Sequence, residues 1–168
     1  MKYYRIDNRQ FEKGGNIRPQ AEFVKRAKEN QLKIEKILEQ TRPSNKPNRN
    51  TILKLFGDCE AAKKFWIRHS NTIIYEVKIG ENKIIHKGDY NLIEQIAKTS
   101  DSERQIELAE KYWSDECIED TIIEYFVDFA EVVEIISNSE EERKNTRTAH
   151  YDMTVNPRVR VIRCSEIR

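Results

Sequence analysis

The 168-residue sequence has few of the side chains that build common metal and disulfide sites. It contains three cysteines and three histidines, far apart and without CxxC or metal-ligand spacing. An odd number of scattered cysteines argues against a disulfide framework and against a zinc site. We therefore expect no bound metal and a reducing, cytoplasmic setting.

Several catalytic motifs are missing as well. The chain has no GxGxxG, no Walker loop, no GxSxG and no HExxH. These absences argue against dinucleotide-fold hydride transfer, P-loop phosphoryl transfer and zinc hydrolysis. No apolar run approaches the roughly 20 residues that span a bilayer, and the N-terminus lacks the apolar stretch of a signal peptide. We expect no membrane partner.

What the chain does contain suits a folded domain with a hydrophobic core. Apolar residues make up 38% of the sequence and charged residues 35%, with seven Tyr, six Phe and two Trp. A chain of this length fits one domain, residues 1–168. We expect an α+β fold, a curved, mostly antiparallel pair of sheets with helices around it. The expected strands are residues 3–6, 72–79, 83–86, 122–127, 131–136 and 159–163. Two helices are expected at residues 21–40 and 91–98. Two more are expected from their caps: one begins at Asp58 and ends near His69, and the other begins at Asp101 or Ser102 and ends at Tyr112 and Trp113.

Two further local patterns complete the expected organisation. Gly80, Glu81 and Asn82 predict a turn that makes 72–79 and 83–86 a β-hairpin. The prolines and asparagines of 41–50 predict an ordered loop, and the polar stretch 137–156 predicts a flexible one.

The formal net charge of +1 conceals a strong polarity along the chain. The net charges of residues 1–57, 58–100, 101–142 and 143–168 are +8, +1, −13 and +5. If the two basic ends meet, they form a positive cleft for a phosphate-bearing ligand. The alternative is that basic and acidic elements attract each other across the fold.

The most informative residue is Glu124, which interrupts the apolar run of residues 122–127. A buried carboxylate without a partner costs roughly 1 to 3 kcal/mol or more. It must therefore reach solvent, a counter-charge or a functional site. This makes Glu124 a candidate catalytic residue, and the alternative is a strand residue paired with Lys or Arg.

Short motifs occur in a characteristic order along most of the chain: YYRI at 3–6, PNRNTILKLF at 47–56, AAKKFW at 61–66, IIYEVKI at 73–79, IHKGD at 85–89, YW at 112–113 and IEYFV at 123–127. In this order the chain resembles the small ADP-ribosyltransferase-like domains. That group includes diphtheria-like toxins, the DNA-modifying toxin DarT and bacterial relatives. The resemblance implies a toxin-like glycosyltransferase that transfers ADP-ribose from NAD to a nucleic-acid or protein acceptor.

The resemblance also implies roles for three residues. Arg5 on the first strand would hold NAD, and Thr51 would support the nicotinamide ribose. Glu124 would polarise the ribose hydroxyl and stabilise the cationic transition state. The position two residues before Glu124, where relatives often carry a second acid or a glutamine, is Ile122, so modification of an arginine acceptor is not expected.

Elementary chemistry assigns further candidates. A fixed carboxylate stabilises the positive charge that develops on the ribose more than it stabilises the ground state. Arg5 and Arg49 could clamp the pyrophosphate, while Tyr112 or Trp113 could stack on nicotinamide or adenine. Each candidate also has a structural alternative: an edge-strand charge for Arg5, a loop cap for Arg49, core anchors for Tyr112 and Trp113, and an ordinary strand entry for Thr51.

A second function remains open from the sequence alone. The chain could be a non-catalytic binding module of phage or mobile-element origin. Its basic first third would then bind nucleic acid, or its acidic segment 101–142 would bind a protein. Binding through phosphates would weaken steeply with salt.

Overall fold

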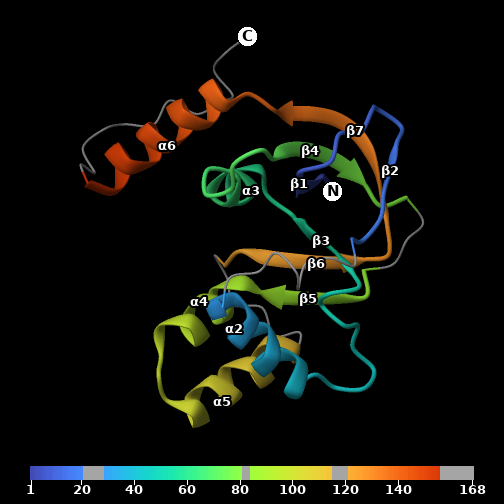
Figure 1. Cartoon of the computed structure of the whole chain (residues 1–168). Helices are drawn as coiled ribbons and strands as arrows, with labels where there is room; N and C mark the ends of the chain where they lie inside the picture. Colours follow the sequence, from blue (N-terminus) through green and yellow to red (C-terminus); the bar gives the residue numbers. More distant parts are fainter. Residues whose placement is uncertain (21–28, 81–83, 115–120, 156–168) are drawn as a thin grey trace.

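The computed structural model describes residues 1–20, 29–80, 84–114 and 121–155 (Figure 1). Its elements combine an antiparallel sheet with helices, which is the α+β class that the sequence predicts. In chain order they are β1 (Tyr3–Asp7), β2 (Asn16–Ile17), α2 (Glu29–Gln40), β3 (Leu53–Phe56), α3 (Cys59–Trp66), β4 (Ile73–Lys78), β5 (His86–Asp89), α4 (Tyr90–Lys98), α5 (Ser102–Trp113), β6 (Ile123–Val127), β7 (Ala130–Ser137) and α6 (Glu140–Val155).

All described strands belong to one antiparallel sheet with the order β2-β7-β4-β1-β3-β6-β5. The prediction of two sheets is therefore wrong, because the described strands form one sheet. The sheet curves strongly between its two halves (Figure 1). Pairing across the middle of the sheet cannot be read from local periodicity.

The two halves of the sheet meet at a short junction between β1 and β3. Only Tyr4 and Phe56 are paired there, whereas β1 pairs with β4 along its whole length. Arg5 bridges the junction, because its Nη1 donates a hydrogen bond of 3.0 Å to the carbonyl oxygen of Lys54. A side chain thus replaces a ladder hydrogen bond at the point where the strands separate.

The predicted hairpin between 72–79 and 83–86 does not form. β4 lies between β1 and β7, so both of its edges are occupied, while β5 pairs with β6 in the other half of the sheet. The turn signal correctly marks the end of β4, but the sheet partners are distant in sequence. Long-range pairing overrides the local hairpin signal here.

The described helices largely follow the predicted ones. α2 confirms residues 29–40 of the long helix, and residues 21–28 lie outside the described part. Asp58 caps α3 by accepting a hydrogen bond of 2.7 Å from the backbone nitrogen of Ala61, and that helix ends at Trp66. Asp101 caps α5 in the same way through Glu103. These caps satisfy backbone donors that a helix start leaves unpaired.

The C-terminal part differs most from expectation. The stretch predicted as a flexible loop contains helix α6, and the predicted strand 159–163 lies outside the described residues. Arg143 and Arg147 of α6 donate hydrogen bonds to the backbone carbonyls of Thr72 and Ile67. The guanidinium of Arg143 also lies 4.8 Å from the ring centre of Trp66. These tertiary contacts hold a helix whose sequence has almost no apolar face.

The core lies on both faces of the sheet because side chains alternate along each strand. One face carries a cluster around Leu53, Leu55, Val127 and Tyr75. On the opposite face, Phe126 packs with residues of α2, α4 and α5, which gather beside β5 and β6 (Figure 1). α3 packs against β1, β3 and β4 through its own cluster. The face of β6 that carries Phe126 also carries Glu124.

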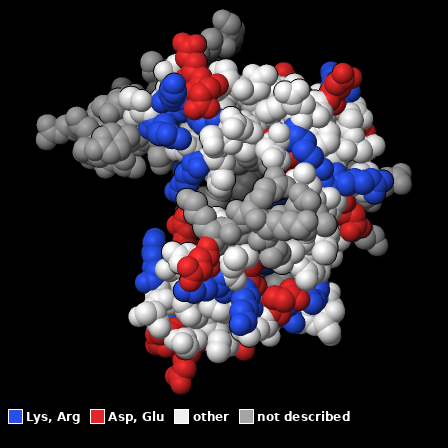
Figure 2. Space-filling model, viewed as in Figure 1, with Lys and Arg blue, Asp and Glu red and all other residues white. Residues whose placement is uncertain are grey.

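Charges of both signs are interspersed on the face shown in Figure 2. The strong polarity along the sequence therefore does not produce one single-sign patch on this side of the molecule. Within the described ranges, none of the helices combines the length and apolar character needed to cross a membrane.

Candidate functional site

Glu124 lies on β6, which is the middle strand of the half of the sheet formed by β3, β6 and β5. Its neighbours across the strands are Phe56 on β3 and Gly88 on β5. The residue is 5% exposed, so its carboxylate is buried between the sheet and the helices. A buried carboxylate must be paired, and two other elements supply its partners.

Arg49 is the first partner, delivered by the loop that precedes β3. Its Nη1 donates to Glu124 Oε2 at 2.7 Å, and the residue is 4% exposed. Its Nε and Nη2 donate to the two carboxylate oxygens of Glu35 on α2, at 3.0 and 3.2 Å. One guanidinium therefore joins a helix to a strand by pairing with two carboxylates, one of them bidentately.

Tyr112, near the end of α5, is the second partner of Glu124. Its hydroxyl donates to Glu124 Oε2 at 2.9 Å, and it accepts a hydrogen bond from Arg49 Nη1. The ring lies directly over Gly88, where a Cβ atom would come within 3.0 Å of it. The absence of a side chain at position 88 is what allows the Tyr112 ring to reach Glu124.

Lys54 lies on the same face of the sheet, because it is paired with Phe126, two residues from Glu124. Its Nζ is 3.9 Å from Glu35 Oε1, and its side chain is 18% exposed. We call Glu35, Arg49, Lys54, Tyr112 and Glu124 the Arg49 cluster. It draws on α2, the loop before β3, β3 itself, α5 and β6.

The electrostatics of the Arg49 cluster keep its carboxylate charged. Burial alone would raise the pKa of Glu124, but the charges of Arg49 and Lys54 and the two hydrogen bonds lower it below its ordinary 4.5. Burial raises the pKa of Tyr112 well above 10, so its hydroxyl remains a donor. Burial and the charge of Arg49 lower the pKa of Lys54 to about 8.

Arg5 belongs to a neighbouring ionic group rather than to the Arg49 cluster itself. Its Nε and Nη2 each donate to Asp7 Oδ2 at 3.2 Å. Arg9 donates to both oxygens of the same carboxylate at 2.9 Å. Asp7 is buried, whereas the arginine side chains are 24% and 28% exposed. This group adjoins the Arg49 cluster through the hydrogen bond from Arg5 to the Lys54 carbonyl.

Trp113 and Thr51 lie outside the Arg49 cluster. Trp113 is buried and its Nε1 donates to the Leu38 carbonyl at 2.8 Å, while its ring lies 4.9 Å from that of His86. Thr51 is exposed, and its hydroxyl donates to the Asn48 carbonyl. Tyr112, like Trp113, has its ring in the core. Trp113 therefore has the contacts of a core anchor, and Thr51 has those of an ordinary residue before a strand.

Sequence reasoning missed Glu35 and Lys54. Lys54 carried a usable signal, since it interrupts the apolar run of residues 52–56 as Glu124 interrupts its own run. Glu35 had none, because a glutamate on an amphipathic helix is ordinary. The structure thus joins Arg49, Tyr112 and Glu124, which the sequence nominates separately, and adds two residues to them.

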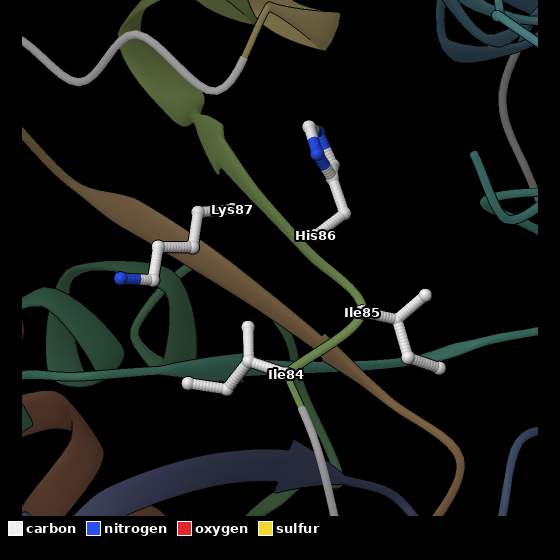
Figure 3. Close-up of a pocket in the computed structure, with 4 residues that line it drawn as sticks. All are labelled: Ile84, Ile85, His86 and Lys87. Atoms are coloured by element: carbon white, nitrogen blue, oxygen red, sulfur yellow. The ribbon is translucent and has the colours of Figure 1, made fainter. Parts of the chain in front are cut away.

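A separate pocket of about 320 Å³ lies along the start of β5 and is lined by Ile84, Ile85, His86 and Lys87 (Figure 3). His86 and Lys87 point to opposite sides of the chain there. His86 turns toward the core, against Tyr112 and Phe126. None of these four lining residues belongs to the Arg49 cluster.

In the part of the chain that the structure describes, no three His, Cys, Asp or Glu side chains are grouped as metal ligands. Comparison with family models and with curated proteins gave no match.

Proposed function

We propose that the chain is an NAD-dependent mono-ADP-ribosyltransferase that uses Glu124 to cleave the bond between nicotinamide and ribose. The observation that carries the proposal is the convergence of Glu124, Arg49 and Tyr112. They come from separate parts of the sequence and meet at one carboxylate oxygen. Replacing buried ion pairs by apolar residues often leaves a fold as stable or more stable, so a buried charged cluster suggests a role beyond stability.

The hydrogen bonds of Glu124 support this role. The bonds from Arg49 and Tyr112 both end on Oε2 of the carboxylate. In this proposal a ribose hydroxyl donates to the other oxygen, Oε1. The lowered pKa keeps the carboxylate negative at neutral pH. A negative charge fixed in a buried site stabilises positive charge that develops on the ribose.

The surrounding cations suit the other parts of NAD. Arg5 and Lys54 are partly exposed, so they offer positive charge for a pyrophosphate. In this proposal Arg49 and Tyr112 orient the carboxylate and do not contact the substrate. No buried ring of the cluster offers an open face for stacking, so the bases of NAD would rest on other residues. The acceptor would be a macromolecule, either nucleic acid or protein.

The test measures nicotinamide release from NAD by the purified chain and by Glu124→Gln. Glutamine keeps the shape and an acceptor oxygen but removes the charge. We expect a loss of about 10²- to 10³-fold, the usual effect of removing one electrostatic stabiliser. The matched control is Glu131→Gln, a change on β7 at a carboxylate paired with Lys78. A folded Glu124→Gln protein that cleaves NAD at the original rate would refute the proposal.

A further inference from the structure

The segment that leads from β1 into β2 carries basic side chains beside one edge of the sheet (Figure 1). Residues 8–18 contain three basic residues and one acidic residue: Arg9, Lys13 and Arg18 against Glu12. Lys13 and Arg18 are exposed, and the side chain of Arg9 is 28% exposed. Within the described residues, neither Lys13 nor Arg18 forms an ion pair. Their charges therefore face solvent.

The two arginines of this segment lie over aromatic rings. The guanidinium carbon of Arg9 is 5.0 Å from the ring centre of Phe11, and that of Arg18 is 5.3 Å from the ring centre of Phe129. Both rings are half-buried. Arg9 Nη2 donates to the Arg18 carbonyl oxygen at 2.9 Å, so the two residues lie side by side. A cation held over a ring keeps N–H donors that can still bind a phosphate.

Buried groups fix this segment in place. The buried Tyr75 hydroxyl donates to the Arg9 carbonyl oxygen at 2.9 Å and accepts from the Phe11 backbone nitrogen at 3.1 Å. Asp7, which is also buried, accepts from Arg9 Nε and Nη2 at 2.9 Å. Arg9 Nη1 has no acceptor among the described residues. A surface that is ordered before its ligand arrives loses less conformational entropy on binding.

We propose that this surface binds the phosphate backbone of single-stranded nucleic acid. We call it the Arg18 surface and define it as Arg9, Phe11, Lys13, Arg18 and Phe129. Basic side chains interleaved with aromatic rings suit a single strand, because the cations bind phosphates and the rings contact bases. A duplex fits less well. Its major groove is read by a helix or a two-stranded ribbon, and this segment contains only the two-residue strand β2.

The Arg18 surface is separate from Glu124. Tyr75, which anchors the surface, precedes Glu76 on β4, so the two side chains point to opposite faces of the sheet. Glu76 is paired with Tyr4, and Tyr4 with Phe56. Phe56 is in turn paired with Glu124, which therefore shares the face of Glu76. The inference goes beyond the proposed function and does not depend on it.

The experiment measures the binding of labelled oligo(U) and oligo(dT) by fluorescence anisotropy, at salt concentrations from about 50 to 200 mM. Three phosphate contacts predict a slope of about −2 for the logarithm of the association constant against the logarithm of the salt concentration, since each contact to a single strand contributes about −0.7. The double variant Lys13→Gln/Arg18→Gln should reduce the slope to about −0.7 and weaken binding at the lowest salt by about tenfold or more. Arg18→Lys keeps the charge and should keep the slope.

The matched control is Lys98→Gln/Arg104→Gln, which makes the same change of net charge at exposed residues of α4 and α5. It should bind as the unchanged protein does. The inference fails if the unchanged protein binds neither oligonucleotide at the lowest salt. It also fails if Lys13→Gln/Arg18→Gln and the control have the same affinity and slope. Duplex DNA of equal length bound as tightly as oligo(dT) would contradict the preference for single strands.

Discussion

Arg49 and Glu124 are 75 residues apart in the sequence and form a 2.7 Å ion pair in the core. Their side chains are 4% and 6% exposed. The pair fixes the loop before β3 against β6, and Glu35 attaches the same guanidinium to α2. Arg49 thus joins three segments that no local sequence pattern connects.

Arg49 pairs with two carboxylates, whereas Glu124 pairs with one arginine. Removing Arg49 and removing Glu124 should therefore have unequal effects on stability. Arg49→Met leaves Glu35 and Glu124 without their shared cation, whereas Glu124→Gln leaves Arg49 paired with Glu35. Removing one partner of a buried pair costs about 3 to 5 kcal/mol, so we expect Arg49→Met to reach this range and Glu124→Gln to cost clearly less. Urea unfolding of both single variants and of the double variant measures this. Additive effects in the double variant would contradict a direct coupling between the residues.

Gly88 is expected to be indispensable for the position of Tyr112. A Cβ atom there would lie within 3.0 Å of the buried ring, so Gly88→Ala must displace it. We expect a loss of about 1 to 3 kcal/mol in unfolding free energy, typical of an overpacked core. In a Tyr112→Ala background the same change should cost little, because the ring is gone. Equal costs of Gly88→Ala in both backgrounds, measured by thermal unfolding, would show that the ring does not set the constraint.

Asp7 predicts a loss of stability in acid. Burial alone would raise its pKa, but the hydrogen bonds from Arg9 and the charge of Arg5 lower it below its ordinary 3.8. The ionised form is therefore favoured by folding. Its contribution is complete above pH 3.8 and is lost as the pH falls through the lower pKa of the folded state. Asp7→Asn should be less stable at pH 6 and should lose less stability between pH 4 and pH 2.

The control for this titration is Asp128→Asn, at an exposed aspartate between β6 and β7. It should leave the acid dependence of the unfolding free energy as it is in the unchanged protein. An Asp7→Asn variant with the original acid dependence would mean that Asp7 does not contribute to it.

Helix α6 is expected to depend on the contacts of its buried Arg143. Arg143 is buried against Trp66 and donates to the Thr72 carbonyl, so Arg143→Ala removes both contacts, although Trp66 Nε1 still donates to the same carbonyl. We expect a loss of about 1.5 to 3 kcal/mol in unfolding free energy, the usual contribution of a hydrogen bond from a charged group. Lys144→Ala removes the adjacent exposed side chain and should be nearly neutral. Protease cleavage within α6 that is no faster in Arg143→Ala than in Lys144→Ala would contradict this anchoring.

Local chemistry determined much of what the sequence predicted correctly. Asp58 and Asp101 mark helix starts because an aspartate can accept bonds from the first free backbone nitrogens. Glu124, in the apolar run of β6, is a candidate from the sequence because a buried charge requires a partner. The sequence also nominated Arg49 and Tyr112, without indicating that they meet Glu124.

Only the tertiary structure decided which segments lie together. The turn after β4 predicts a hairpin, yet β4 pairs with β1 and β7, because sheet partners depend on distant strands. α6 has almost no apolar stripe and is held by Arg143 and Arg147 on the carbonyls of Thr72 and Ile67, which local periodicity cannot register. Glu124 itself was evident from the sequence as a carboxylate in need of a partner. Its partner is Arg49, with Glu35 and Lys54 beside it, because the fold brings α2 and the segment 49–56 against β6. Charges separated in sequence interact strongly only when the fold brings them within a few ångström.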